Sequence, residues 1–252
     1  MKILFKRVFD ISFSLIGLIF LSPVFLAVAI MIKLDSPGPV FFRQIRVGKD
    51  GKDFYICKFR KMHIKGSDGG PNVTADNDAR LTDIGRILMK YKLDELPQIW
   101  NVLKGDMSFV GPRPELPCFV RLYDDQQRQI LKVKPGITDY AAIEFIDEGE
   151  LLGQAEDPEK FYVEKLMNRK LAQNFKYVSE MSVQTDLKII LKTIYRIIRK
   201  MGGRNHEGSH SSRGQRDKAE ALYHHASKTA GADRGASNTG TDPGEPQSSG
   251  NN

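Results

Sequence analysis

The chain has 252 residues and a formal net charge of +7, enough length for one domain and an appendage. Residues 202–252 hold six basic and six acidic side chains, so the positive excess lies in residues 1–201 and favours an anionic partner such as phospholipid, nucleotide phosphate or nucleic acid. Neither of the two cysteines is in a CxxC or metal-ligand spacing, and only His63 of the five histidines lies before residue 202. This argues against a disulfide framework and histidine-based catalysis, and leaves carboxylates to act as acid, base or nucleophile.

An uncharged stretch from Ile11 to Ile32 is the first element, with basic residues before and after it. Its length is about that needed to cross a bilayer, ~20 residues. Ser22 and Pro23 lie at its middle, where proline costs ~3 kcal/mol in a straight helix and a serine hydroxyl can satisfy a freed carbonyl. Two arms of ~11 residues are each ~16 Å long, about one leaflet. A re-entrant helix, a spanning helix and a buried core helix are the alternatives, and the positive charge at both ends favours re-entry from the cytoplasm.

A β-hairpin is expected next. Asp35–Pro39 forms a rigid exit turn, and the strands Val40–Val47 and Asp53–Arg60 are joined by Gly48–Gly51. The second strand ends in a run of cations, whose simplest interpretation is a solvated strand end.

A loop and a helix follow the hairpin. The segment 65–78 is rich in Gly, Asp and Asn and lacks the Gly-Lys-Ser/Thr ending of a phosphate-binding loop. Arg80–Lys90 is expected to be helical, with a buried stripe of apolar residues, Ile84, Ile87, Leu88 and Tyr91.

The segment Leu93–Pro114 contains an acidic pair, a short helix and a Pro-Arg-Pro corner. Pro97 fits the first turn of the helix, which places Asp94 at the N-cap with Glu95 just inside. One apolar face is expected to be buried, comprising Leu96, Ile99, Trp100 and Leu103. On these residues alone, the segment could be no more than a capped helix.

The C-terminal half is expected to be mostly helical. Residues 115–133 predict one or two amphipathic helices, residues 134–138 a turn, and Asp157 caps a helix that begins at Pro158 and runs to about Tyr177. Residues 185–199 form a basic amphipathic helix, which suits an anionic membrane interface or a core helix with one solvated face. Residues 202–252 have few apolar side chains and are expected to be disordered.

The segment Leu93–Pro114 resembles the signature of the bacterial sugar transferases, the monotopic phosphoglycosyl transferases, and the resemblance runs from Lys6 to Arg199. It implies an α+β fold that is mostly helical, with a small antiparallel β-hairpin and an N-terminal re-entrant membrane helix broken at Ser22 and Pro23. The implied organisation is a re-entrant helix over 1–36, a cytosolic catalytic domain with interfacial amphipathic helices over 37–201, and a disordered tail over 202–252. The implied location is the cytoplasmic face of the bacterial inner membrane.

The resemblance also implies site residues. Asp94 would be the catalytic nucleophile, and Glu95 a second catalytic carboxylate that holds Mg²⁺. The substrate would be bound by basic and proline side chains, namely Lys58, Arg60, Lys90, Pro112, Arg113 and Pro114. Two positions depart from the family pattern, because Met89 stands where arginine is usual and Asp139-Tyr140 replaces Gly-Trp. Lys90, Lys92 or Arg86 could supply the charge that is missing at position 89.

The implied reaction is transfer of a sugar-1-phosphate from a UDP-sugar to polyprenyl (undecaprenyl) phosphate, which initiates surface glycan assembly. The implied partners are these two substrates and membrane lipid, with a homodimer left open. A membrane-bound UDP-sugar hydrolase and a non-catalytic membrane adaptor are the alternatives. Nucleic acid is not expected, because no aromatic-basic RNA motif or recognition helix stands out.

Overall fold

The computed structural model describes residues 2–64 and 70–203. The chain divides into a compact unit, residues 1–201, and a second unit, residues 202–252. Apart from its first two residues, the second unit lies outside the described residues, and so does the disorder expected there. Within the first unit the fold is mostly helical with a small antiparallel hairpin, which confirms the expected fold class.

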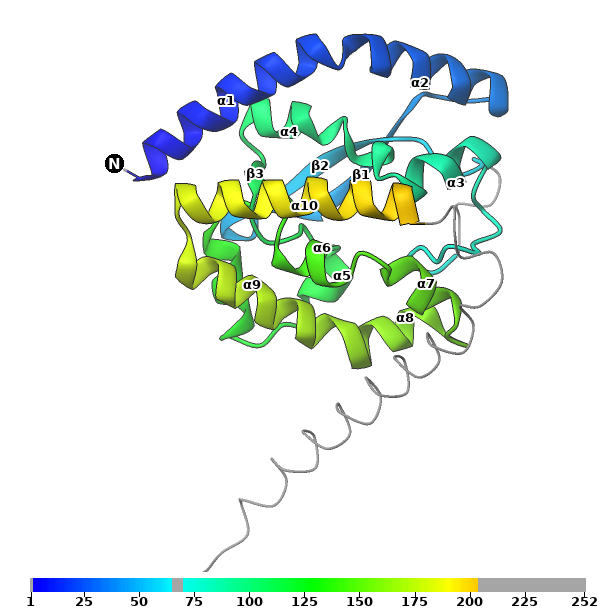
Figure 1. Ribbon diagram of the computed structural model, residues 1–252. Helices are drawn as coiled ribbons and strands as arrows, with labels where there is room; N and C mark the ends of the chain where they lie inside the picture. Colours follow the sequence, from blue (N-terminus) through cyan, green and yellow to red (C-terminus); the bar gives the residue numbers. More distant parts are fainter. Residues whose placement is uncertain (1, 65–69, 204–252) are drawn as a thin grey trace, which may run out of the picture. The chain divides into compact units, whose positions relative to one another are not determined.

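Two apolar helices form the N-terminal part. Helix α1 (Lys2–Phe20) and helix α2 (Ser22–Asp35) meet at a bend of 59° and lie end to end along one side of the unit (Figure 1). The Ser22 hydroxyl donates to the carbonyl of Ile19 at 2.7 Å, so it satisfies a carbonyl at the break as expected. Among the described residues no single helix is long and apolar enough to cross a membrane, but this bent pair together is. Its exposed apolar side chains suggest membrane association, for example Ile19 at 71% and Phe20 at 79% exposure.

The hairpin consists of β1 (Phe41–Val47) and β2 (Asp53–Phe59), which pair antiparallel from Phe41 with Phe59 to Val47 with Asp53. A 3₁₀ turn, η1 (Lys49–Gly51), joins them. The side chain of Asn101 completes the outer edge of β2, since its Nδ2 donates to the Tyr55 carbonyl at 2.7 Å and its Oδ1 accepts from the Cys57 amide at 2.9 Å. Asn101 lies in helix α4 (Gln98–Lys104) and therefore fixes that helix against the strand.

Helix α3 (Asp83–Lys90) begins three residues later than the sequence predicts, because Thr82 caps it by accepting from the Gly85 amide at 2.9 Å. Its predicted stripe is only partly correct. Leu88 is 1% exposed and packs with α2, whereas Ile87 is 49% exposed.

The acidic pair does not cap the next helix. Asp94 and Glu95 lie in a 3₁₀ turn, η2 (Leu93–Glu95), and helix α4 (Gln98–Lys104) is preceded by Pro97. The cause is Lys92, whose left-handed backbone (φ 58°) starts the turn ahead of the helix. The predicted apolar face is also partly wrong, because Ile99 is 6% exposed but Trp100 is 52% exposed.

A second, parallel strand pair was not predicted. Strand β3 (Ser108–Val110) pairs with β4 (Gly136–Thr138), where the sequence suggested only a turn. The strands lead into a close backbone approach, since a Cβ added to Gly136 would lie 2.0 Å from the Gly111 amide nitrogen. Between them lie α5 (Pro117–Val120) and a 3₁₀ segment, η3 (Gln127–Lys132), both shorter than the helices predicted there.

The remaining helices follow β4 in the chain. They are α6 (Tyr140–Glu144), α7 (Glu148–Gly153), α8 (Pro158–Phe161), the π-helical segment η4 (Tyr162–Met167), α9 (Asn168–Glu180) and α10 (Val183–Gly203). Asp157 caps α8 through the Glu159 and Lys160 amides, as expected. Helix α10 confirms the predicted amphipathic helix, with exposed apolar side chains such as Leu191 at 58% and Ile198 at 61%.

Candidate active site

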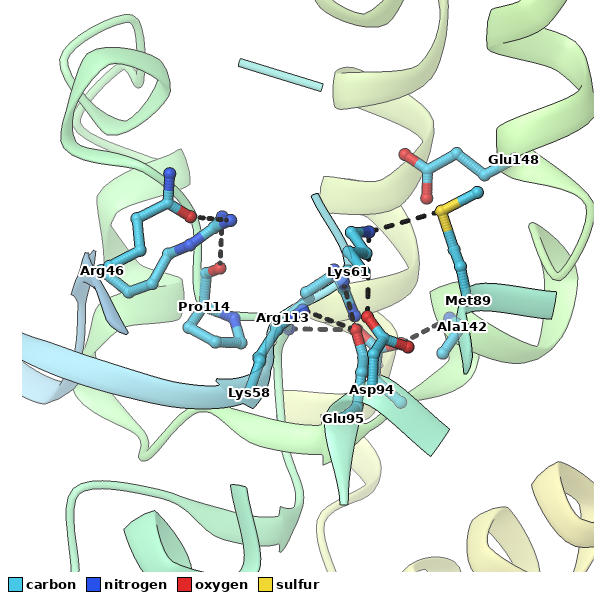
Figure 2. Close-up of polar contacts among 12 residues, drawn as sticks. Arg46, Lys58, Lys61, Met89, Asp94, Glu95, Arg113, Pro114, Ala142 and Glu148 are labelled. Carbon is cyan, nitrogen blue, oxygen red and sulfur yellow. Dashed lines mark hydrogen bonds and ion pairs between the residues drawn. The ribbon is translucent and has the colours of Figure 1, made fainter. Parts of the chain in front are cut away.

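Two consecutive carboxylates form the centre of the site. Asp94 is 2% exposed and Glu95 is 9% exposed, although both lie in a polar turn. Figure 2 shows Lys58 and Lys61, from the end of β2 and just beyond it, and Arg113, from the Pro-Arg-Pro corner, converging on them. A buried carboxylate needs charged or hydrogen-bonding partners to stay ionised, and the three cations supply them.

Glu95 is held by two of these cations. Its Oε1 accepts from Lys58 Nζ at 2.7 Å and from Arg113 Nη2 at 2.9 Å. Burial alone would raise the pKa of Glu95, but Arg113 and Lys58 hold it well below its ordinary value. In return, Glu95 raises the pKa of Arg113, whereas burial lowers the pKa of Lys58 to about 8 despite the carboxylate. Glu95 is therefore a charged anchor that fixes two cationic side chains, Lys58 and Arg113.

Asp94 has fewer polar contacts than Glu95. Its Oδ2 lies 3.7 Å from Lys61 Nζ, beyond hydrogen-bond distance, and its Oδ1 is buried with no hydrogen-bond partner among the described residues. A carboxylate oxygen that accepts no hydrogen bond keeps its lone pairs available for attack on an electrophile. The two neighbouring acids thus differ in chemistry because they differ in partners.

Sequence reasoning missed Lys61, which lies two residues beyond the end of β2. It singled out Lys58 and Arg60 instead. The structure brings Lys58 to Glu95 but turns Arg60 away, because its guanidinium donates to the carbonyls of Pro37 at 2.6 Å and Ser36 at 2.8 Å. In a strand, residues 59 and 61 would point to the same face, opposite to Lys58. Strand β2 ends at Phe59, so this rule no longer applies to residue 61, and a strand end predicted at Phe59 could have drawn attention to Lys61.

Lys90 is also not brought to the carboxylates. It is exposed and its Nζ lies over the Tyr91 ring, 5.2 Å from the centroid. Of the predicted substrate-binding cations, only Lys58 and Arg113 therefore meet at the acidic pair.

The Pro-Arg-Pro corner is fixed by its backbone. The Pro112 carbonyl accepts from the Gly136 amide at 2.9 Å, and the Pro114 carbonyl accepts from Arg46 Nη1 at 3.2 Å. Between them, the Arg113 amide donates to Asp139 Oδ2 at 3.1 Å. Three contacts from outside the corner thus hold the backbone from which the Arg113 guanidinium reaches Glu95.

The Glu95 carboxylate could also hold a magnesium ion that takes its other ligands from a bound substrate and water. Mg²⁺ prefers oxygen ligands and is often bound by one or two carboxylates together with substrate phosphates. The second oxygen of Glu95, Oε2, accepts no hydrogen bond from the described residues, so it could be such a ligand. Residues 2–64 and 70–203 contain no group of three or more metal-ligating side chains, so the remaining ligands would have to come from phosphate and water.

The site is a buried acid pair held by cations, in the same unit as a bent apolar helix pair. This combination indicates an enzyme that acts at a membrane. The model of the family described as "Bacterial sugar transferase" matches residues 1–200, and the chain belongs to this family.

The chain is similar to several curated proteins. It is 40% identical over 204 residues to a UDP-N-acetylgalactosamine-undecaprenyl-phosphate N-acetylgalactosaminephosphotransferase of Aeromonas hydrophila, covering 79% of this chain and 45% of the relative. It is 38% identical over 200 residues to a UDP-glucose:undecaprenyl-phosphate glucose-1-phosphate transferase of Escherichia coli K12, covering 77% and 40%. It is 39% identical over 201 residues to the exopolysaccharide production protein PSS of Rhizobium leguminosarum, covering 77% and 95%. The chain thus spans less than half the length of the first two relatives and nearly all of the third.

Proposed function

We propose that this protein transfers a sugar-1-phosphate from a UDP-sugar to undecaprenyl phosphate at the cytoplasmic face of the bacterial inner membrane, with release of UMP. Family membership and the names of the similar proteins support this reaction class. The observation that carries it is Asp94, a buried carboxylate whose Oδ1 has no hydrogen-bond partner among the described residues and whose Oδ2 lies 3.7 Å from Lys61 Nζ.

The proposed reaction has two steps. Asp94 Oδ1 attacks the phosphorus that carries the sugar, the bond to the bridging oxygen breaks, and UMP leaves with that oxygen. The phospho-sugar is then joined to the carboxylate as an acyl phosphate. An oxygen of undecaprenyl phosphate next attacks the same phosphorus and displaces Asp94, which gives a diphosphate-linked lipid. No strong base is needed, because both attacking groups are already anions.

Repulsion between anions is the main obstacle, and the cations offset it. Arg113 and Lys58 bind the diphosphate oxygens, with the planar guanidinium suited to a two-point contact. Glu95 would hold Mg²⁺, which when bound neutralises charge on the diphosphate. The Pro-Arg-Pro corner keeps the guanidinium in place throughout.

The membrane position accounts for the acceptor. A bent helix pair that enters and leaves one leaflet would place the site at the level of the lipid headgroups, where the phosphate of undecaprenyl phosphate lies. The exposed apolar residues of α1 and α2 support this arrangement. A water-soluble acceptor would gain nothing from it.

The test omits the lipid. Purified protein mixed with Mg²⁺ and a panel of UDP-sugars, including UDP-glucose and UDP-N-acetylgalactosamine, should release at most about one UMP per active site and gain the mass of a phospho-sugar on the peptide containing Asp94. Adding undecaprenyl phosphate should then permit turnover. Asp94→Asn should abolish both results, whereas Asp125→Asn, at an exposed aspartate, should change neither.

Other results identify the alternatives. Continuous UMP release without lipid would indicate a hydrolase. No UMP release with any UDP-sugar and lipid would indicate a non-catalytic adaptor. UMP release that depends on lipid, with no adduct in rapid-quench experiments, would replace the covalent route by direct transfer.

A further inference from the structure

We infer that Lys61 is a catalytic residue whose ammonium group moves from Asp94 to the phosphoryl oxygens as Asp94 attacks. The inference rests on the proposed function and assigns a residue that sequence reasoning did not select.

The first observation is how Lys61 approaches the nucleophile. Its Nζ lies 3.7 Å from Asp94 Oδ2, while Asp94 Oδ1 is left without a hydrogen-bond partner in the described part of the chain. Lys58 and Arg113, by contrast, are both bonded to Glu95. Lys61 is therefore the cation paired with Asp94, and it approaches the oxygen that does not attack.

The second observation is that contacts with the start of α3 fix the backbone of Lys61. Its carbonyl accepts from the Thr82 amide at 3.0 Å, and the next residue, Met62, forms an isolated β-bridge with Leu81. Gly85 allows this approach, because a Cβ there would lie 1.9 Å from the Lys61 carbonyl oxygen. The start of α3 thus fixes the backbone, and the side chain, 21% exposed, extends toward the carboxylate.

The third observation is the neighbour on α3. Met89 Sδ lies 3.3 Å from Lys61 Nζ, as Figure 2 shows. A cationic side chain at position 89 could therefore place its charge where Lys61 places it now. In this chain the charge comes from residue 61, and the sulfur of Met89 accepts a hydrogen bond from it.

The chemistry explains why a cation at this point accelerates the reaction. As Asp94 Oδ1 bonds to phosphorus, Oδ2 becomes the carbonyl oxygen of an acyl phosphate and loses its negative charge. Lys61 keeps its proton and pairs instead with the phosphoryl oxygens, whose charge must be stabilised as the bridging bond to UMP breaks. The ammonium therefore interacts more strongly with the transition state than with the free carboxylate at 3.7 Å, which is the condition for catalysis.

The experiment uses the full chain and the single-turnover release of UMP in the absence of lipid. Lys61→Met should slow the burst about 100-fold or more, the size expected when one preorganised group that stabilises charge is lost. The exchange variant Lys61→Met/Met89→Lys, which swaps two side chains in contact, should recover to within about 10-fold of wild type. Lys49→Met, at an exposed lysine in η1, should match wild type. Melting temperatures are measured for all four proteins.

The outcomes separate this inference from the proposed function. A wild-type burst with an unchanged Lys61→Met burst would overturn the role of Lys61 and leave the proposed function intact. A folded exchange variant that is as slow as Lys61→Met would overturn it as well, because a cation at this point of the site would then not be enough to accelerate the attack. If Lys61→Met does not fold, the folded exchange variant alone decides. No wild-type burst with any UDP-sugar would overturn both the covalent route and the inference.

Discussion

Asp94 and Glu95 are neighbours in the chain, but their side chains meet different surroundings. Glu95 is bonded to two cations, and removing its charge would leave the buried ammonium of Lys58 and the half-buried guanidinium of Arg113 without a carboxylate partner. Asp94 has one oxygen with no hydrogen-bond partner among the described residues and a lysine only at 3.7 Å from the other. Glu95 therefore contributes to stability and Asp94 costs stability, as is common for a reactive group.

This difference predicts opposite effects on unfolding. Glu95→Gln should destabilise the protein by about 3 kcal/mol, because breaking a buried ion pair leaves uncompensated charge. Asp94→Asn should leave the melting temperature unchanged or raise it by a few degrees, while abolishing UMP release. Thermal unfolding of both variants beside wild type measures this. A large loss of stability in Asp94→Asn would show that the Lys61 contact is structural.

Arg113 offers a kinetic prediction at the same scale. Arg113→Ala should raise the Michaelis constant for the UDP-sugar or lower turnover, by about 10-fold or more, since a charge-assisted hydrogen bond is worth about 1.5–3 kcal/mol. Arg113→Lys should recover only part of the loss, because an ammonium lacks the planar fork of a guanidinium. The exposed Arg121 supplies the control, and Arg121→Ala should behave as wild type. Wild-type kinetics in Arg113→Ala would reduce the corner to a structural turn.

At the scale of elements, the parallel pair β3–β4 aligns the arginine corner with α6. Asp139 follows β4 directly, is 1% exposed, and joins two elements: it accepts from the Ala142 amide as the cap of α6 and from the Arg113 amide at 3.1 Å. Burial raises the pKa of Asp139, and these amides and Lys170 act against that rise. The departure from Gly-Trp at this point of the sequence therefore adds a contact to the arginine corner.

Asp139→Asn tests this contact. The amide keeps the size of the side chain, but an NH₂ group facing the Arg113 amide cannot accept its hydrogen bond. We expect the Michaelis constant for the UDP-sugar to rise by up to about 10-fold, since an unsatisfied buried amide costs about 1–3 kcal/mol, with less change in the turnover number. Steady-state kinetics with Asp125→Asn as control would measure it. If Asp139→Asn lowered the turnover number as much as Arg113→Ala does and left the Michaelis constant unchanged, Asp139 would not act by positioning Arg113.

Local patterns predicted the elements whose residues carry their own signals. The hairpin strands, the cap at Asp157 and helix α10 all match the sequence, because alternation, capping residues and helical periodicity are local properties. The pairing of β3 with β4 depends on contacts between distant segments. The left-handed backbone at position 92 is formed by a lysine and not by a glycine or asparagine, which usually mark such a position. No local pattern specifies these, so the turn at Asp94 and the parallel pair were missed.

The same limit applied to the site. Asp94, Glu95, Lys58 and Arg113 were predicted together, and the structure brings them together. Arg60 was assigned by its neighbours in sequence, but a buried guanidinium goes to the nearest free carbonyls, which here are at the end of α2. Which cation of a basic run reaches a site depends on where the strand ends, and that is set by packing against α3.

At the scale of the whole molecule, partly buried polar contacts join the helices with exposed apolar surface, α1 and α10, to each other and to strand β4 beside the site. Lys6 of α1 is paired with Asp186 of α10, and Thr193 of α10 is hydrogen-bonded to Thr138 of β4 at 2.7 Å. Helix α10 exposes apolar side chains beside basic ones, an arrangement suited to an anionic membrane interface. If α1 and α2 enter the same leaflet, these contacts hold the site at a fixed height relative to it.

The topology of α1 and α2 is the property on which this arrangement depends. Proline in the first turn of α2 removes a helix hydrogen bond, and the observed bend is 59°. Positive charge flanks both ends of the pair, which favours keeping both ends in the cytoplasm. We therefore expect the chain to enter and leave the membrane by one face, with the uncharged arms, residues 11–21 and 22–32, each spanning about one leaflet.

Cysteine labelling distinguishes this from a spanning helix. In a background of Cys57→Ser and Cys118→Ser, single variants Leu4→Cys and Pro39→Cys place thiols at exposed positions near the two ends of the pair. An impermeant maleimide added to intact cells should label neither, and permeabilisation should allow both to react, because both ends would face the cytoplasm. Labelling of only one of them in intact cells would establish a spanning helix. Pro23→Ala, which restores the missing hydrogen bond and favours a straight helix, should shift some molecules toward that pattern.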